Sequence, residues 1–162
     1  TDGLTGLSNH RRCQEVLRSE IRRAGRYGRS VVLMMMDVDG FKRFNDEYGH
    51  PQGDLLLKKL AEILTAGVRA VDTVGRYGGE EFLIILPEAS VPEASMIAER
   101  LRRSVEECGF DTGVAGRKER KTVSIGMASY PLDGTTADAL VQVADHALYK
   151  AKRMGKNRVL IA

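Results

Sequence analysis

An uninterrupted apolar run, Val31 to Met36, constrains the fold of this chain more than any other feature. The run contains six residues and stops at Asp37. It is far shorter than the roughly 20 apolar residues of a membrane-spanning helix, so we expect no membrane segment here. A short, abruptly ended run with β-branched residues instead predicts a strand over Ser30 to Met36 that is buried on both faces, with Asp37 at its C-terminal end.

The remaining elements alternate around this strand. Apolar periodicity predicts helices over Asn9–Tyr27, Phe41–Tyr48, Gln52–Ala66, Pro92–Cys108 and Ala137–Met154. Further strands are predicted over Val71–Tyr77, Glu81–Leu86, Thr122–Ser129 and Arg158–Ile161, with a loop or hairpin tip over Gly113–Lys121. We expect one α/β (α+β) domain over residues 1–162, with a mixed sheet of about five strands, helices on both faces, and a polymerase-palm or ferredoxin-like layout.

Two of the predicted helices carry a clear apolar face. In the helix over Gln52–Ala66 the residues expected to be buried are Leu55, Leu56, Leu60, Ile63 and Leu64. In the helix over Pro92–Cys108 they are Met96, Ile97, Leu101 and Val105.

Charge and cysteine content exclude several classes of protein. The chain has 25 basic and 22 acidic residues, a balance too even to indicate a nucleic-acid partner. Cys13 and Cys108 lie in separate predicted helices, so we expect free thiols and a reducing, cytoplasmic location, either free or as the cytoplasmic part of a membrane-anchored protein. The first residues lack the pattern of a signal peptide and begin inside a motif, which indicates a domain excised from a longer protein with an upstream partner.

Two aspartates follow the buried strand. Strand side chains alternate, so Asp37 and Asp39 can project from the same side of the strand's end, an edge where sheets of this kind often bind ligands. Paired carboxylates suit Mg²⁺, which is commonly held by one or two carboxylates and substrate phosphates. For Asp39 an equally good interpretation is that it caps the helix beginning near Phe41.

The predicted hairpin carries a second pair of carboxylates. Gly78-Gly79 accepts the positive φ angles of a tight turn, and Glu80 and Glu81 would lie at its tip. A solvated turn would have the same sequence. With Asp37 and the nearby cations Lys42 and Arg76, however, these glutamates would supply what phosphoryl or nucleotidyl transfer requires.

Basic residues crowd the end of the last predicted helix. They are Lys150, Lys152, Arg153 and Lys156. They could simply stabilise the helix dipole. Lys152 and Lys156 are four residues apart and would share a helical face, so they could also hold a triphosphate.

Several motifs, taken together and in order, resemble the GGDEF family of diguanylate cyclases over essentially the whole chain. The matching segments are Asp2–Asn9 with Arg11 and Arg12, Asp37–Asp46, Gly49-His50, Gly53-Asp54, Arg76–Phe82, Ser124–Gly126, and Ala147–Lys152 with Gly155–Asn157. The chain reads Gly-Gly-Glu-Glu-Phe where the family signature has Gly-Gly-Asp-Glu-Phe. Lys156 stands where arginine is frequent, and His10 also replaces an arginine.

The resemblance implies a nucleotidyl cyclase fold and assigns roles to particular residues. Asp37, the Val38 carbonyl and Glu80 would bind Mg²⁺ or Mn²⁺, and Asp37, Glu80 and Glu81 would serve catalysis. Asn45 and Asp54 would recognise guanine, since a carboxylate facing the guanine N–H groups rejects adenine. The remaining substrate contacts would come from Phe41, Lys42, Gly78, Gly79, Lys152 and Lys156.

The resemblance also implies an inhibitory site for the product. Arg69 and Asp72 match an Arg-x-x-Asp motif just ahead of the hairpin, and Arg100 on the following helix could add a second guanidinium. An arginine and an aspartate at this spacing can equally be a surface ion pair, which contributes little to stability.

The implied reaction condenses two GTP molecules into cyclic di-GMP. Each domain would hold one GTP, so a homodimer of domains must form, controlled by an upstream sensory or regulatory domain. Two alternatives remain at this point: a catalytically weak domain that senses GTP or cyclic di-GMP, and a polymerase or adenylyl-cyclase-type palm with the same metal chemistry.

Overall fold

The computed structural model describes residues 1–162 and is built around a five-stranded sheet with the order β2-β3-β1-β6-β7. Its strands are β1 (Val31–Val38), β2 (Thr73–Arg76), β3 (Glu81–Pro87), β6 (Val123–Tyr130) and β7 (Val159–Ile161). Neighbouring strands pair antiparallel except β6 and β7, which are parallel. The sheet is therefore mixed, as predicted, and β1 occupies its centre.

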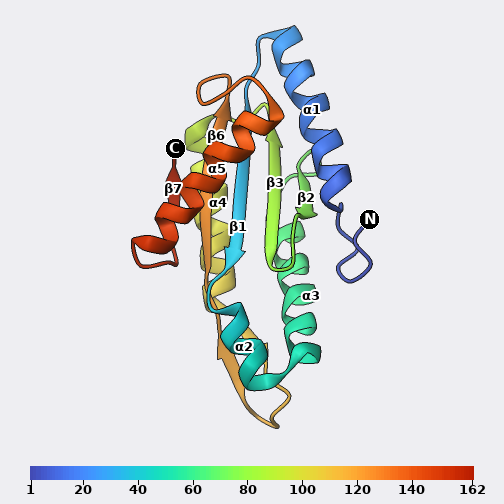
Figure 1. Ribbon diagram of the computed structural model, residues 1–162, viewed down its shortest axis with the longest axis vertical. Helices are drawn as coiled ribbons and strands as arrows, with labels where there is room; N and C mark the ends of the chain where they lie inside the picture. The colour runs from blue at the N-terminus through green and yellow to red at the C-terminus, as the bar shows by residue number, and fades with distance from the viewer.

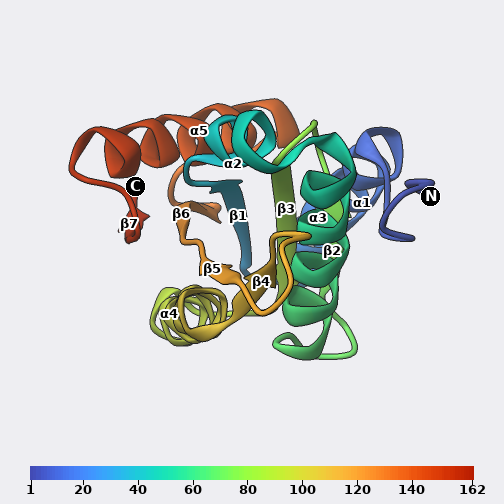
Figure 2. The same ribbon diagram turned by 90° about the horizontal axis from the view of Figure 1, so that it is seen from below.

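Helices cover both faces of this sheet. They are α1 (His10–Tyr27), α2 (Phe41–Tyr48), α3 (His50–Ala66), α4 (Val91–Glu107) and α5 (Ala137–Arg153). In Figure 2, seen from below, α5 lies above the sheet and α4 lies beneath it. Val31, Leu33 and Met35 pack with residues of α1 and α5, whereas Val32, Met34 and Met36 pack with residues of α3 and α4. The burial of β1 on both faces is confirmed, and it accounts for the continuous apolar run.

The segment predicted as a loop or hairpin tip is a small hairpin. Strands β4 (Gly109–Asp111) and β5 (Lys118–Arg120) pair antiparallel and form a separate two-stranded sheet. No helix of the chain combines the length and the apolar character needed to cross a bilayer. Both cysteines are free, as predicted.

Several details of the sequence predictions were wrong. Strand β1 continues to Val38, so Asp37 lies inside the strand rather than after it. Leu55 and Met96 are exposed. In α3 the buried face is rotated by one residue and takes in Leu57, and in α4 small alanines, Ala94 and Ala98, form the buried face beside Ile97.

The end of α5 also differs from the prediction. The helix stops at Arg153, and Lys156 lies beyond it with a φ of 64°. Lys152 and Lys156 therefore do not share a helical face. The Lys156 N–H donates instead to the Ala151 carbonyl at 3.0 Å, which closes the helix end.

Helix α5 packs directly on the backbone of β6. A Cβ atom at Gly126 would lie 2.2 Å from both the Ala144 carbonyl oxygen and the Leu148 nitrogen. Because these are backbone atoms, they cannot move aside without shifting the helix. Gly126 therefore sets the distance between α5 and the sheet.

Gly126→Ala is expected to destabilise the fold by about 3 kcal/mol, the upper range for overpacking a core. A chemical denaturation curve measures the change. Gly3→Ala is the matched control, because a Cβ there meets nothing within 4 Å. Equal stability of the two variants would contradict this account of the packing.

Candidate active site at the end of the central strand

The C-terminal end of β1 meets the turn between β2 and β3 and the start of α2 (Figure 1). In the sheet, Asp37 lies opposite Glu81 of β3 and Ser124 of β6. The sheet register thus brings the two predicted carboxylate sources, the strand end and the hairpin, to one place.

Asp39 is buried, with 6% of its surface exposed, and its carboxylate is fully occupied. Ser124 Oγ donates to Oδ1 at 2.8 Å, while Thr122 Oγ1 and the Asn157 backbone N–H donate to Oδ2 at 2.8 and 3.0 Å. Lys152 Nζ lies 3.5 Å from Oδ1. Both oxygens of Asp39 thus accept hydrogen bonds, and Asp39 joins the end of β1 to Thr122, Ser124 and Asn157.

The proposed capping role of Asp39 was wrong. The residue at the N-terminus of α2 is Gly40, with a φ of 69°, and no side chain caps the helix. A positive φ at this position is readily adopted by glycine. It turns the chain sharply between the strand and α2.

Asp37, unlike Asp39, has a carboxylate oxygen that accepts no hydrogen bond. Its Oδ1 atom is buried and has no hydrogen-bond partner, while Lys152 Nζ lies 3.3 Å from Oδ2. An unpaired buried carboxylate oxygen is costly. Asp37 is thus the acidic side chain in this region with a buried oxygen free to accept a further ligand.

The carboxylates near Asp37 repel one another. Burial raises the pKa of Asp37, although Lys152 opposes this shift. Burial and the nearby Asp37 charge also raise the pKa values of Glu80 and Glu81. A single ammonium group, that of Lys152, therefore faces these three carboxylates as well as Asp39, and the site has an excess of negative charge that a cation would relieve.

The donor set fits a hard divalent cation. No three His, Cys, Asp or Glu side chains are grouped so as to hold a metal by themselves. Asp37 and Glu80 offer only carboxylate oxygens, and the other ligands would be backbone oxygen, water and substrate phosphate. That division of ligands is usual for Mg²⁺.

The turn between β2 and β3 does not have the predicted backbone conformation. Gly78 and Gly79 do not adopt positive φ angles. The turn closes because the N–H groups of Tyr77 and Gly78 donate to the Glu81 carbonyl at 2.8 and 3.3 Å. A side chain at Gly78 would lie 3.0 Å from the Glu81 carboxylate, so this glycine makes room for that group.

Arg76 stabilises this turn rather than facing a substrate. Its guanidinium donates to the Gly79 carbonyl at 3.0 and 2.8 Å and lies 3.3 Å from an Asp2 oxygen. The ring of His10, the residue that departs from the family pattern, stacks on Tyr77 with centroids 4.0 Å apart. Both contacts tie the N-terminal segment to the hairpin.

The predicted guanine contacts lie along α2 and α3. Asn45 Oδ1 is buried without a partner, and a Cβ at Gly53 would lie only 1.7 Å from it. Gly53 therefore creates the space in which the Asn45 amide sits, next to the exposed Asp54. This role of Gly53 was not predicted, although a glycine inside a helical pattern is a recognisable signal.

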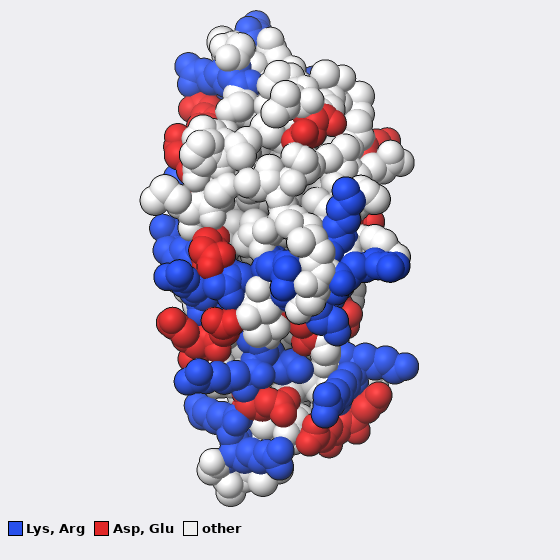
Figure 3. Space-filling model, turned by 90° about the vertical axis from the view of Figure 1, so that its left-hand side faces the viewer, with Lys and Arg blue, Asp and Glu red and all other residues white.

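The other predicted substrate residues differ in exposure. Phe41 is buried in the core, with 9% of its surface exposed. Lys42 and Lys156 are exposed, whereas Lys152 is partly buried beside Asp37. Charged side chains gather over the lower half of the face in Figure 3, and the upper half is largely uncharged.

The predicted inhibitory residues meet around the segment after α3. The Asp72 side chain is fully buried, and Arg69 Nη2 donates to its Oδ1 at 2.7 Å and to the Pro87 carbonyl at 2.9 Å. Arg100 donates to the Gly67 carbonyl. Arg69 and Asp72 also line a surface pocket of about 390 Å³.

Comparisons with known proteins agree on one family. The model of the family described as "Diguanylate cyclase, GGDEF domain" matches residues 1–158. Diguanylate cyclase A of Treponema denticola is 42% identical over 142 residues, and the response regulator PleD of Caulobacter vibrioides is 40% identical over 160 residues. These matches cover 88% and 99% of this chain but only 38% and 35% of the two relatives.

Solved structures give the same result. The GGDEF domain of DgcB from Caulobacter crescentus, crystallised with c-di-GMP, superimposes with a TM-score of 0.93 at 32% identity. The match covers 99% of this chain and 92% of that domain. The chain thus spans about one domain of its structural relatives and little more than a third of the curated proteins above.

In the absence of a bound metal ion, removing one of the mutually repelling carboxylates should stabilise the protein. A carboxyl whose pKa is raised in the folded state destabilises the fold above its unfolded pKa, near ~4. Glu80→Gln is therefore expected to raise Tm at neutral pH by at most about 2 °C, because solvent screens the repulsion at this partly exposed position. The gain should shrink as the pH falls through the raised pKa values.

Differential scanning calorimetry in a chelating buffer measures this difference. Glu62→Gln, on the exposed side of α3, is the control and should leave Tm unchanged. A Glu80→Gln variant less stable than the wild type at neutral pH would show that the site is not electrostatically strained.

Proposed function

Because the chain belongs to the diguanylate cyclase family of GGDEF domains, we propose that it condenses two GTP molecules into cyclic di-GMP and two pyrophosphates. The observation that carries the proposal is the buried, unpartnered Asp37 Oδ1 beside Glu80, with an unpartnered Asn45 Oδ1 on the neighbouring helix. Each of these acceptors lacks the partner that a bound metal ion or guanine would supply.

Asp37 and Glu80, with the Val38 carbonyl, would hold Mg²⁺ or Mn²⁺. The ion would supply charge neutralisation on the triphosphate and activation of the attacking 3′-hydroxyl. Glu80 and Glu81, whose pKa values are raised, are suited to accept the proton of that hydroxyl, because a base works best when its pKa approaches the working pH. Lys152, already beside Asp37, would move to meet phosphate oxygens.

The guanine base would be read by Asn45 and Asp54. The Asn45 Oδ1 atom can accept a hydrogen bond from guanine, and the Asp54 carboxylate can accept from its N1–H and N2–H groups. Adenine would leave these acceptors unpaired, and the loss of such buried hydrogen bonds discriminates strongly between substrates.

The reaction requires a second copy of the domain. The cluster around Asp37 and Glu80 offers one set of base and phosphate contacts, and each 3′-hydroxyl must reach the α-phosphate of the other GTP. Two domains facing each other would align both attacks. In the longer protein, which we place in the cytoplasm where GTP is available, an upstream domain would control this encounter.

The product would inhibit the enzyme through Arg69, Asp72 and Arg100. The Arg69 guanidinium now donates to Asp72 and to the Pro87 carbonyl, and the Arg100 guanidinium donates to the Gly67 carbonyl. Arginine forks suit both phosphate and guanine edges. Binding of cyclic di-GMP would exchange these internal contacts for contacts with the product.

Product identification after incubation with GTP and Mg²⁺ tests this function. We expect cyclic di-GMP from a variant dimerised by an added coiled coil, and none from the same variant carrying Glu80→Gln, with Glu62→Gln as the active control. Nucleotide binding without release of pyrophosphate would indicate a sensor domain. A linear or adenine-containing product would indicate a different palm enzyme.

Arg69→Ala should relieve product inhibition while leaving the initial rate unchanged. The concentration of cyclic di-GMP that halves the rate is expected to rise at least about tenfold, since one charged hydrogen-bonding group is worth ~1.5–3 kcal/mol. Initial rates at increasing product concentration measure the effect. An inhibition curve identical to that of the wild type would mean that Arg69 and Asp72 form only an ion pair.

A further inference from the structure

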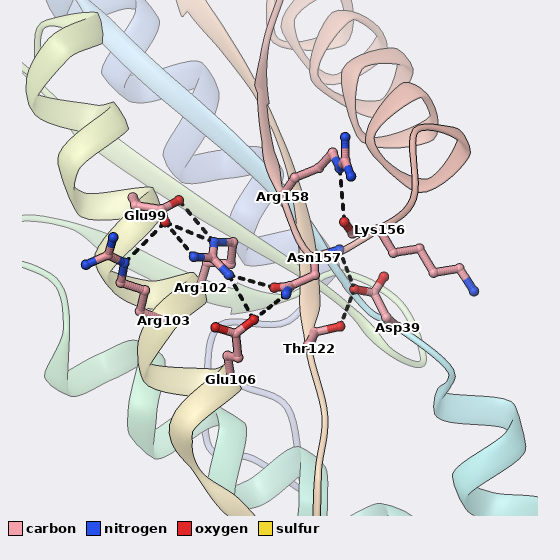
Figure 4. A network of polar contacts seen from close by, with 9 residues as sticks. All are labelled: Asp39, Glu99, Arg102, Arg103, Glu106, Thr122, Lys156, Asn157 and Arg158. Atoms are coloured by element: carbon pink, nitrogen blue, oxygen red, sulfur yellow. Dashed lines mark hydrogen bonds and ion pairs between the residues drawn. The ribbon is translucent and has the colours of Figure 1, made fainter.

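The segment that follows α5 has an unusual backbone. Gly155, Lys156 and Asn157 have φ angles of 118°, 64° and 48°. Three successive residues in the positive-φ region are rare, and only one of them is glycine. Such a conformation persists when the surrounding structure holds it. Lys156, the exposed lysine of this segment, extends its side chain away from the neighbouring polar groups (Figure 4).

Asn157 holds this segment from two sides. Its backbone N–H donates to Asp39 Oδ2 at 3.0 Å, at the end of β1. Its side chain faces α4, where Asn157 Nδ2 donates to Glu106 and Arg102 Nη1 donates to Asn157 Oδ1 at 2.8 Å. Figure 4 shows Asn157 between these two groups of contacts.

The α4 side of this arrangement is itself rigidly connected. Arg102 has only 13% of its side chain exposed, and it bonds Glu99 and Glu106 as well as Asn157. Because all of its partners lie on α4 or on Asn157, the guanidinium has little freedom to turn. Arg103, by contrast, is 68% exposed and reaches only Glu99.

We propose that Asn157 is a positioning residue for triphosphate binding, which fixes the Lys156 backbone so that the Lys156 ammonium meets the terminal phosphates. The proposal rests on the proposed function, in which GTP occupies the site at Asp37. Asp39 and the Arg102–Glu106 pair are the two supports of this positioning. Asn157 suits the place because asparagine tolerates the left-handed conformation better than most residues.

Positioning matters here because Lys156 has no contact that orients its ammonium group. Only the backbone determines where the side chain starts, and a lysine has four rotatable bonds beyond that point. If the segment relaxed from its positive-φ conformation, the ammonium would sample many directions. Its electrostatic contribution to triphosphate binding would then largely disappear.

The experiment measures binding of a non-hydrolysable GTP analogue with Mg²⁺, and of GMP, by isothermal titration calorimetry. Asn157→Gly keeps the N–H that Asp39 accepts and permits positive φ, but it removes both side-chain contacts with α4. We expect it to weaken analogue binding about tenfold, or ~1.4 kcal/mol, and to leave GMP binding unchanged, because GMP lacks the terminal phosphates.

The double variant distinguishes positioning from direct binding. Lys156→Ala should weaken analogue binding to a similar extent, and Asn157→Gly should then cause no further loss, because the two residues act through one contact. Arg102→Ala should reproduce the effect of Asn157→Gly. Arg103→Ala, on the same helix but without contact to Asn157, should bind the analogue as the wild type does.

Four outcomes would overturn the inference. Wild-type affinity of Asn157→Gly for the analogue would show that the side chain positions nothing. A parallel loss of GMP binding, or additive losses in the double variant, would indicate a general structural defect. If Lys156→Ala binds the analogue normally, the phosphate-binding role of Lys156 in the proposed function is wrong, and the inference is wrong with it. If only Asn157→Gly binds the analogue normally, the inference is wrong but the proposed function stands.

Discussion

The imbalance of charge around the end of β1 is the interaction on which the rest of the structure depends. Burial raises the pKa of Asp37, burial and the nearby Asp37 charge raise the pKa values of Glu80 and Glu81, and the single nearby ammonium is that of Lys152. Such an arrangement costs stability unless a cation completes it. The fold holds it together because Asp37 lies in the central strand of the sheet, whereas Glu80 and Glu81 belong to the hairpin beside it.

The two aspartates at this strand end make different contacts. Asp39 accepts hydrogen bonds from β6 and from the segment after α5, so it joins the elements that carry Asp37, Lys152 and Lys156. Asp37 keeps a free oxygen. The carboxylate of Asp39 therefore holds neighbouring elements in place, whereas that of Asp37 keeps a buried oxygen without a partner. Gly126 also fixes how closely α5 approaches the sheet.

The sequence predicted the parts of this site that depend on local pattern. The abrupt end of the apolar run located Asp37, and the sheet with helices on both faces followed from the alternation of elements. The role of Asp39 could not be predicted, because its partners Thr122 and Asn157 lie 83 and 118 residues away. The backbone of the Gly78-Gly79 turn was missed for a different reason: the Arg76 guanidinium, only three residues from Gly79, helps to hold it, and glycine composition alone does not reveal such a contact. The Arg102–Asn157 contact likewise joins residues 55 apart.

We propose that Asp37, and not Asp39, is the strand-end carboxylate that binds a divalent cation. Mn²⁺ binding, followed by electron paramagnetic resonance with the GTP analogue present, tests it most directly. The account predicts that Asp37→Asn lowers Mn²⁺ affinity by about 100-fold, the scale of losing a charged ligand, whereas Glu62→Gln changes nothing. Equal Mn²⁺ affinity of Asp37→Asn and the wild type would contradict the account.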